Sequence, residues 1–350
     1  MKIFGIGIIA FFLVVIQMLI YKRYWAKNLY VSVRFRQDAI YEGEEGEIVE
    51  VIENRKRLPL PMLKVKFQTS RNLGFLDDKG SKTTDQYYRN DIFQVGIGEK
   101  ITRTLHFYGK KRGYYRINNI DLLGSDLFFL MEDSRSQSTN QYLYVYPKVL
   151  QEEEFRLSLQ KLNGEILVKR HMLEDPFEYR GIREYQPFDD IRSVNWKATA
   201  RTGNLKVNQK NYTAMQTIRI FLNLEDEGIW KKDNEAEKCM QMVMGIASFF
   251  LSQGIRVSCY ANGKDILTEE PMHLPGLSGM VHLDVLGKAL ARLDISKEAH
   301  PFVPMFRERV LEDGDGFFTF FVSSNGYDDF VNLLEECKSK GMEYHWYHVE

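Results

Sequence analysis

Thr217–Leu224 reads TIRIFLNL, and Glu235–Leu251, shortly after it, reads EAEKCMQMVMGIASFFL. The first segment is an apolar run of strand length, whereas the second has apolar residues at helical spacing and is closed by Gly254. Such alternation predicts right-handed βαβ units on a mostly parallel sheet, so residues 217–350 are expected to form an α/β domain. The pattern continues with expected strands at Ile255–Tyr260, Gly316–Val322 and Glu343–Val349 and expected helices around Val281–Leu293 and Tyr327–Ser339.

Residues 29–147 show a different pattern. Apolar and polar side chains alternate with a period of two, and the Arg57-Leu58-Pro59-Leu60-Pro61 stretch indicates a corner between strands, because proline cannot donate to a strand ladder. Ser134–Asn140 is expected to form a polar loop. Short strands at this spacing predict a β-sandwich of roughly immunoglobulin size. The expected strands are Tyr30–Phe35, Glu47–Glu53, Leu63–Gln68, Asp91–Val95, Lys100–Phe107, Tyr114–Ile117, Ile120–Leu123 and Tyr142–Tyr146.

The N-terminal segment Ile3–Ile20 reads IFGIGIIAFFLVVIQMLI and contains no charged residue. With Tyr21 it forms a helix of about 28 Å, close to the thickness of the hydrocarbon core of a bilayer. A secretory signal peptide is the alternative, but the basic region before the apolar run is only Met1-Lys2, and no A-x-A-like cleavage site follows. The segment is therefore expected to be a retained membrane anchor within residues 1–28.

The flank of this segment predicts its orientation. Tyr21, Tyr24 and Trp25 have the composition of an aromatic belt at the membrane interface, and three basic residues accompany them: Lys22, Arg23 and Lys27. Only Lys2 and the α-amino group oppose these charges, so the positive-inside rule places the C-terminal domains in the cytoplasm. The chain is expected to be a cell-membrane protein with a single span.

Composition excludes several classes of protein. The chain has 47 basic and 48 acidic residues, which argues against a general nucleic-acid binder. A hydrophobic content of 44% and an aromatic content of 13% exclude low-complexity disorder. Three cysteines, Cys239, Cys259 and Cys337, offer no disulfide framework, and their apolar neighbours predict buried thiols.

Catalytic motifs are missing from the sequence. It contains no G-x-S-x-G elbow, no H-E-x-x-H pair and no G-x-x-x-x-G-K-[ST] phosphate loop. Gly5-x-Gly7-x-x-Ala10 fits a loose dinucleotide fingerprint, but it lies inside the apolar segment and no strand precedes it. We therefore expect no catalytic residues and no cofactor.

Residues 148–216 form a connector without one clear period, and it holds the densest group of charged and aromatic residues. Six basic residues and no acidic one lie between Ile191 and Arg219. Glu184, Asp189 and Asp190 are placed to pair with Arg192 and Arg201, which suits the fork of the guanidinium group. Three interpretations stay open: a structural clasp that docks the segment on the α/β domain, a surface for a protein partner, and a catalytic or nucleic-acid role. Trp196 and Arg201 are expected to be structural, whereas Arg183 and Lys197 are expected to serve partner association. The candidate residues are Arg183, Tyr185, Asp189, Asp190, Arg192, Trp196, Lys197 and Arg201.

The pattern R-x-Y-x-P-x-D-D-x-R-x-x-x-W-x-x-x-A-R, from Arg183 to Arg201, resembles the signature of the DUF58 family. Leu58-Pro59 and the stretch from Lys111-Arg112-Gly113 to Asp126-Leu127-Phe128 resemble the β-rich half of that family. The resemblance implies a von Willebrand factor A-like α/β domain after a membrane anchor and a β-sandwich. It also implies a MoxR-type AAA+ ATPase as partner. Phe188 and Thr199 depart from the glycine and serine that are common in the family, and one expected span replaces the two of many members.

The same resemblance directs attention to a metal site. A von Willebrand A domain binds Mg²⁺ through D-x-S-x-S and an aspartate in a later turn, and the matching positions here are Glu225–Ile229 and Ser324-Asn325-Gly326. Ile229 offers no oxygen and Asn325 no charge, whereas hard cations need several oxygen ligands. We expect no intact site, only degenerate positions at Glu225, Glu227 and Asn325.

Two functions from different classes follow. The first is a non-enzymatic, membrane-anchored interaction or assembly protein that works with a cytoplasmic MoxR-type AAA+ ATPase. The second is a metal-dependent hydrolase that uses the acidic end of the α/β sheet, where such folds place ligands. The anchor and the missing catalytic motifs favour the first.

Overall fold

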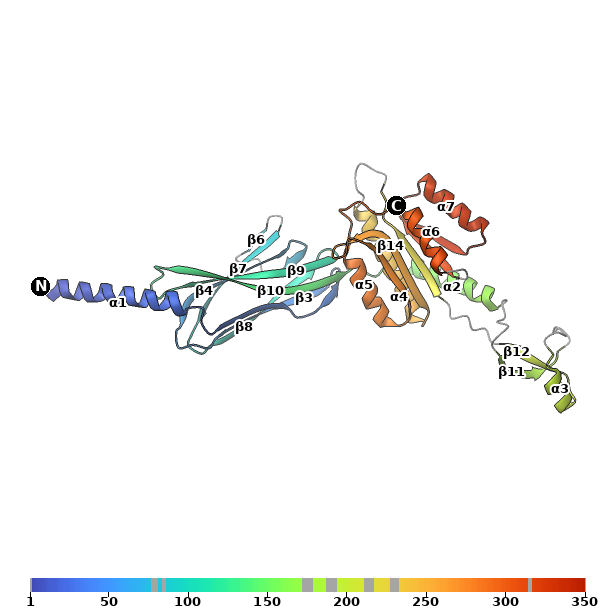
Figure 1. Cartoon of the computed structure of the whole chain (residues 1–350), viewed down its shortest axis with the longest axis horizontal. Coiled ribbons are helices and arrows are strands. Elements are labelled where there is room, and N and C mark those ends of the chain that lie inside the picture. Colours follow the sequence, from blue (N-terminus) through green and yellow to red (C-terminus); the bar gives the residue numbers. More distant parts are fainter. Residues whose placement is uncertain are drawn as a thin grey trace. The chain divides into compact units, whose positions relative to one another are not determined.

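A computed structural model describes residues 2–76, 81–83, 86–171, 179–186, 194–210, 217–226, 233–313 and 317–349 (Figure 1). The chain divides into two units, which are described separately. The first comprises Met1–Lys148 together with Gly287–Leu293, and the second comprises Val149–Leu286 together with Asp294–Glu350.

The first unit begins with helix α1 (Lys2–Tyr24). Its segment Phe4–Tyr24 is long and apolar enough to cross a membrane, which fits a single-pass membrane protein and also fits a signal sequence. The expected aromatic belt is wrong for two of its three residues, because Tyr21 and Trp25 are 1% and 3% exposed and belong to the core of the β-sandwich. Tyr24 is exposed. The end of α1 is thus packed into the folded domain that follows it.

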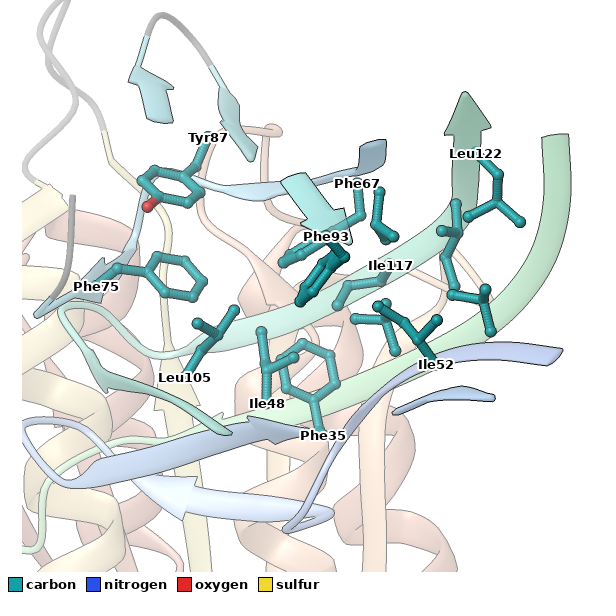
Figure 2. Close-up of a cluster of buried hydrophobic side chains, with 14 of the residues drawn as sticks. Phe35, Ile48, Ile52, Phe67, Phe75, Tyr87, Phe93, Leu105, Ile117 and Leu122 are labelled. Carbon is teal, nitrogen blue, oxygen red and sulfur yellow. The ribbon is translucent and has the colours of Figure 1, made fainter. Parts of the chain in front are cut away.

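The strands of the first unit form two sheets, which confirms the expected β-sandwich. Among the described residues, the sheet orders are β1-β3-β8-β5 and β2-β10-β9-β4-β7-β6. Side chains from both sheets, among them Phe35, Ile48 and Phe93, converge in one apolar core (Figure 2). The strands are β1 (Leu29–Phe35), β2 (Ala39–Tyr41), β3 (Glu45–Asn54), β4 (Leu60–Ser70), β5 (Leu73–Phe75), β6 (Ser81–Thr83), β7 (Gln86–Val95), β8 (Lys100–Gly109), β9 (Gly113–Ser125) and β10 (Glu132–Tyr146).

The expected proline corner is confirmed, because residues 55–59 connect β3 and β4 and Pro61 lies at a register shift of β4. Two other details were wrong. Tyr114–Ile117 and Ile120–Leu123 are parts of one strand, β9, and the expected polar loop Ser134–Asn140 is part of β10. Antiparallel pairing of β9 with β10 runs through both segments.

The polar half of β10 is a strand because its side chains satisfy a neighbouring edge. Gln137 donates from Nε2 to the carbonyl oxygen of Val31 at 3.2 Å, and Thr139 donates from Oγ1 to that of Val33 at 3.4 Å. These carbonyl groups belong to β1, the edge strand of the other sheet. Polar side chains therefore close the sandwich where an apolar residue would leave backbone acceptors without a donor.

The second unit holds an α/β sheet in the order β15-β14-β13-β17-β18. Strand β13 pairs in parallel with β14 and β17, β17 pairs in parallel with β18, and β15 joins β14 in antiparallel fashion. The elements around this sheet are α2 (Glu153–His171), β13 (Thr217–Asn223), α4 (Asp233–Ser252), β14 (Arg256–Asp265), β15 (Pro271–Leu277), α5 (Met280–Ala291), β16 (Leu293–Asp294), α6 (Phe302–Asp313), β17 (Phe318–Ser323), α7 (Asp328–Ser339) and β18 (Tyr344–His348).

Strand β13 is buried over almost its whole length because helices cover both faces of the sheet. Phe221 and Phe321 are register neighbours on one face, where they pack against Phe302 and Phe330 of α6 and α7. Phe320 points to the other face and packs against Phe250 of α4. The alternation of side chains along each strand thus assigns its residues to two separate helix layers.

Several helices and strands of the second unit were not predicted, because their apolar residues show little periodicity. These are α2, α6, β15 and the two-residue strand β16, which pairs with β14. The expectation of buried thiols is confirmed, because Cys239, Cys259 and Cys337 are free and buried.

Candidate functional site

The residues of the Arg183–Arg201 signature that the structure describes form a small module. It consists of strand β11 (Tyr179–Glu184), the short helix α3 (Trp196–Thr202) and strand β12 (Lys206–Lys210), with β11 antiparallel to β12. Asn195 caps α3, since its Oδ1 accepts a hydrogen bond from the Ala198 N–H at 2.9 Å. Gly203 ends the helix at φ 75°, a left-handed conformation that glycine adopts without strain.

The interior of the module is very small. Val194 and Val207 are buried and form an isolated bridge, whereas α3 contributes no buried residue. Ile182, Trp196 and Leu205 are exposed, and Trp196 is 65% exposed. The expectation that Trp196 is a buried structural residue is therefore wrong, because a helix of seven residues beside a two-stranded sheet leaves no second layer to cover an indole ring.

The charged signature residues have different surroundings. Arg201 is exposed near the end of α3 and lies one turn after Lys197, which is also exposed. Glu184, which we expected to pair with Arg192 or Arg201, forms an ion pair with Lys206 on the opposite strand, with Oε1 and Nζ 3.1 Å apart. Asp189, Asp190 and Arg192 lie outside the described residues, so the clasp that they were expected to form is not described.

Arg183 and Tyr185 each donate a hydrogen bond to a backbone carbonyl group of the module. The guanidinium group of Arg183 donates from Nη1 to the Glu184 carbonyl oxygen at 3.0 Å. The backbone N–H of Tyr185 donates to the Leu205 carbonyl oxygen at 3.0 Å. The module therefore presents an exposed indole beside a basic pair on a frame held by backbone hydrogen bonds.

The carboxyl end of the α/β sheet is a second candidate site. Asn223 ends β13, and Asn262 lies at the neighbouring position in β14; both are fully buried. Asn262 donates from Nδ2 to Asn223 Oδ1 at 3.0 Å and to the His300 carbonyl oxygen at 2.9 Å. The Oδ1 atoms of the two asparagines accept from the N–H groups of Glu225 and Leu224, at 2.9 and 2.8 Å. This asparagine pair ties the loop after β13 to the segment before α6.

Glu225 and Asn325, two of the degenerate metal positions, belong to the same network. Glu225 Oε1 accepts from the N–H of Phe302, the first residue of α6, at 2.9 Å, and so caps that helix. The side-chain amide of Asn325 donates to the Glu225 carbonyl oxygen. These hydrogen bonds suit a clasp between loops and do not fit a Mg²⁺ site, which needs carboxylate and other oxygen ligands arranged around one point. Glu227 lies outside the described residues.

A cavity of about 580 Å³ opens beside this network. It is lined by the loops that follow β13 and β17, by the end of β14 with Lys264, and by the segment before α6 with Lys297 and His300. Carboxylate side chains outnumber the two lysines; they are Glu225, Asp226, Asp233, Asp294, Glu298 and Asp329. Within the described part of the chain, no three His, Cys, Asp or Glu side chains gather into a group that could hold a metal ion.

A comparison with protein families matches residues 181–291 to the family described as "Protein of unknown function DUF58". The DUF58 match covers about a third of the chain and agrees with the resemblance of the Arg183–Arg201 motif. The DUF58 match starts at Gly181 in the signature module and runs through β13, α4 and β14 into α5, so both candidate sites have residues within it. No curated protein matches the chain.

Solved structures resemble parts of this chain only weakly. The CARDB domain of a Pyrococcus furiosus protein, solved with di-metal ions, is 14% identical at a TM-score of 0.22, with 33% of this chain and 93% of that domain covered. A non-cellulosomal cohesin from Archaeoglobus fulgidus is 12% identical at a TM-score of 0.24, with 37% and 96% covered. Both likenesses fall far below the level at which a shared function follows.

Sequence reasoning missed the buried asparagine pair of this chain. A signal was present, because the apolar runs TIRIFLN and RVSCYAN each end in an asparagine, at Asn223 and Asn262. Carboxyl ends of neighbouring parallel strands meet at one edge, so two such amides are placed to meet. The cap at Asn195 was detectable in the same way, as an asparagine directly before a helical segment.

Proposed function

We propose that this chain is a non-enzymatic, membrane-anchored interaction protein whose signature module binds a cytoplasmic partner, a MoxR-type AAA+ ATPase. The observation that carries the proposal is the exposed face of α3. Trp196 and the basic pair Lys197 and Arg201 lie together on a helix that buries nothing within its own module. Exposed tryptophan and arginine side chains are the residue types most enriched among the energetic centres of interfaces. The basic pair favours an acidic surface on the partner.

The packing of α1 supports a retained anchor. Tyr21 donates from its hydroxyl group to the Pro59 carbonyl oxygen at 3.0 Å, and Trp25 donates from Nε1 to Asp133 Oδ2 at 2.8 Å. A cleaved signal sequence is removed from the mature protein, so its residues have no role in the folded core. Loss of α1 up to Tyr24 would remove Tyr21 from the sandwich, which favours retention of the helix.

The α/β unit is, in this proposal, a von Willebrand A-like domain that has lost its metal. The parallel pairings of β13 with β14 and β17 support the likeness. At the carboxyl edge, hydrogen bonds of Asn223, Asn262 and Asn325 hold the loops that a bound cation holds in such domains. The domain then serves as a rigid support for the signature module.

A metal-dependent hydrolase remains the second candidate, and the acidic cavity beside Glu225 favours it. The use of Glu225 as a helix cap speaks against it. We expect no Mg²⁺ binding tighter than about 1 mM, the weak end of carboxylate sites. Isothermal titration of the purified protein with Mg²⁺ and Mn²⁺, together with a phosphoester turnover assay, tests this candidate; micromolar binding with turnover would establish the hydrolase instead.

The interaction proposal is tested by a Trp196→Ala variant of the full chain. Truncation of a central interface aromatic costs at least about 2 kcal/mol, a loss of about thirtyfold in affinity. We expect the variant to lose capture of a co-expressed MoxR-type ATPase from solubilised membranes and to keep the melting temperature of the wild type, because the indole is exposed. A Lys197→Ala/Arg201→Ala variant should weaken capture in the same way.

The matched control is Leu157→Ala, which truncates an apolar residue of α2 that is also exposed. It should leave both capture and melting unchanged. Unchanged capture by the Trp196→Ala variant would refute the module as the binding surface, and a large drop in its melting temperature would assign Trp196 a structural role.

A further inference from the structure

The turn between β9 and β10 exposes four large apolar side chains in succession. Leu127, Phe128, Phe129 and Leu130 are between 47% and 63% exposed, within the sequence DLFFLM from Asp126 to Met131. Single exposed apolar residues are ordinary, but a contiguous patch on a soluble surface usually marks a contact with another molecule or a membrane.

Hydrogen bonds between residues of the turn hold its backbone in place. Asp126 donates from its N–H to the Met131 carbonyl oxygen at 3.3 Å and accepts from the Phe129 N–H at 3.2 Å. The carboxylate of Asp126, which is fully buried, accepts at Oδ1 from the N–H groups of Leu130 and Met131, at 2.7 and 3.0 Å. Because the N–H groups of Phe129, Leu130 and Met131 have partners within the turn, moving these groups out of water costs less than it would if they had none.

Phe129 has a backbone conformation that phenylalanine rarely adopts. Its φ is 57°, in the left-handed region where glycine is the residue without strain. Backbone strain of this kind persists where the side chain or the geometry has a use. In this conformation the aromatic ring of Phe129 is exposed at the tip of the hairpin.

Contacts with Gln17 and Trp25 fix the position of the β9–β10 hairpin along α1. Trp25 lies against Gly124, where an added Cβ would come within 2.2 Å of the indole ring, and it donates to Asp133 on the opposite strand. Two residues further along the hairpin, Asp126 Oδ2 accepts from Gln17 Nε2 at 2.5 Å. Gln17 precedes Trp25 by eight residues, which is about 12 Å along a helix. The hairpin therefore runs alongside α1 back into the segment Phe4–Tyr24 that is long enough to span a membrane.

We infer that the Leu127–Leu130 tip inserts into the membrane leaflet next to the C-terminal end of α1, as a second lipid contact of the β-sandwich. This inference rests on the proposed membrane anchor. Interfacial apolar segments are buried about 5–10 Å into the boundary between headgroups and acyl chains. The Gln17 contact places Asp126, at the base of the tip, beside a residue within the apolar segment Phe4–Tyr24. Lipid is the partner that we assign to the exposed patch, because the hairpin is fixed to α1 beside Gln17, within the segment that is long and apolar enough to cross a membrane.

Site-directed spin labelling of the full chain in phospholipid vesicles tests the inference. Single cysteines replace Phe129 at the tip, Phe12 in the middle of α1 and Tyr142 on β10; all three side chains are exposed. The native thiols are buried, and burial raises the pKa of Cys239 to about 12 and that of Cys337 to about 11, so they stay protonated and unreactive at neutral pH. The readout is the accessibility of each label to oxygen, which concentrates in lipid, and to a water-soluble nickel chelate.

We expect the labels at Phe129 and Phe12 to collide with oxygen several-fold more often than with the nickel chelate, and the label at Tyr142 to show the reverse. A lipid-exposed Phe12 label with a Phe129 label as accessible to nickel as Tyr142 would overturn the tip insertion and leave the anchor intact. A water-exposed Phe12 label would refute the anchor itself. A Phe129 label shielded from both probes would show that protein covers the tip. A Leu130→Cys variant repeats the measurement if Phe129→Cys folds poorly.

Discussion

At the scale of single residues, Glu50 is a buried acidic side chain of the sandwich whose charge state affects stability. It lies on β3 at 1% exposure and faces Asp91, whose carboxylate is paired with Arg89 at 2.7 Å and with Arg103 at 2.7 Å. Burial, followed by the negative charge of Asp91, raises the pKa of Glu50 to about 8. The guanidinium groups of Arg103 and Arg89 oppose this rise without cancelling it.

A Glu50→Gln variant should make the first unit more stable at alkaline pH. The pKa of Glu50 in the unfolded chain is near 4.5, so between about pH 4.5 and pH 8 the folded state binds the extra proton, and stability falls as the pH rises through this window. The loss is at most about 1.4 kcal/mol per pH unit for one group. Thermal melting of wild type and variant at pH 5 and pH 9 measures it. The variant should gain several degrees at pH 9 only, and an equal difference at both pH values would contradict the prediction.

At the scale of secondary-structure elements, the joint between α1 and the β9–β10 hairpin depends on one glycine. Trp25 occupies the space where any other residue at position 124 would place its Cβ atom. The ring cannot move aside freely, because its Nε1 is hydrogen-bonded to Asp133 and its surface is 3% exposed. The close approach therefore fixes the end of the helix to the hairpin.

Gly124→Ala should destabilise the first unit by about 1–3 kcal/mol, the usual cost of overpacking a filled site. The matched control is Gly164→Ala in α2, where nothing lies within 4 Å of the added Cβ. That change should be neutral or stabilise the helix by up to about 1 kcal/mol. Thermal melting of both variants checks the pair, and equal effects would show that Trp25 is not held against Gly124.

At the scale of the whole molecule, the basic flank of α1 bears on orientation. Lys22 and Arg23 lie in the last turn of the helix and Lys27 follows it, against Lys2 at the start. Because loops rich in lysine and arginine are usually retained in the cytoplasm, we predict that both folded units lie inside the cell.

A fusion at Glu350 tests this topology. A reporter that is active only outside the cytoplasm should stay inactive, and one that is active only inside should be active. Reversal of Lys22, Arg23 and Lys27 to glutamate should increase external activity, because the charge bias is then lost. High external activity of the unaltered chain would place the domains outside and exclude a cytoplasmic ATPase as partner.

The sequence by itself determined the apolar helix, the sandwich and the alternation of strands and helices in the α/β unit, although α2, α6, β15 and β16 were not predicted. These features follow from local patterns, namely an uncharged run at Ile3–Ile20, alternation with a period of two, and helical spacing in Glu235–Leu251. The resemblance to the DUF58 family also followed from local pattern, because the Arg183–Arg201 motif is contiguous.

Only the tertiary structure decided which residues act together. Ser134–Asn140 looked like a loop because its partners, the carbonyl groups of Val31 and Val33, lie about one hundred residues away in the chain. The same holds for Tyr21 and Trp25, whose aromatic rings suit a membrane interface and a protein core equally well until the β9–β10 hairpin is placed beside them. Trp196 is the opposite case, an indole expected in a core and found exposed. Whether a residue is buried depends on which distant part of the chain packs against it. The local sequence pattern does not show which part that is.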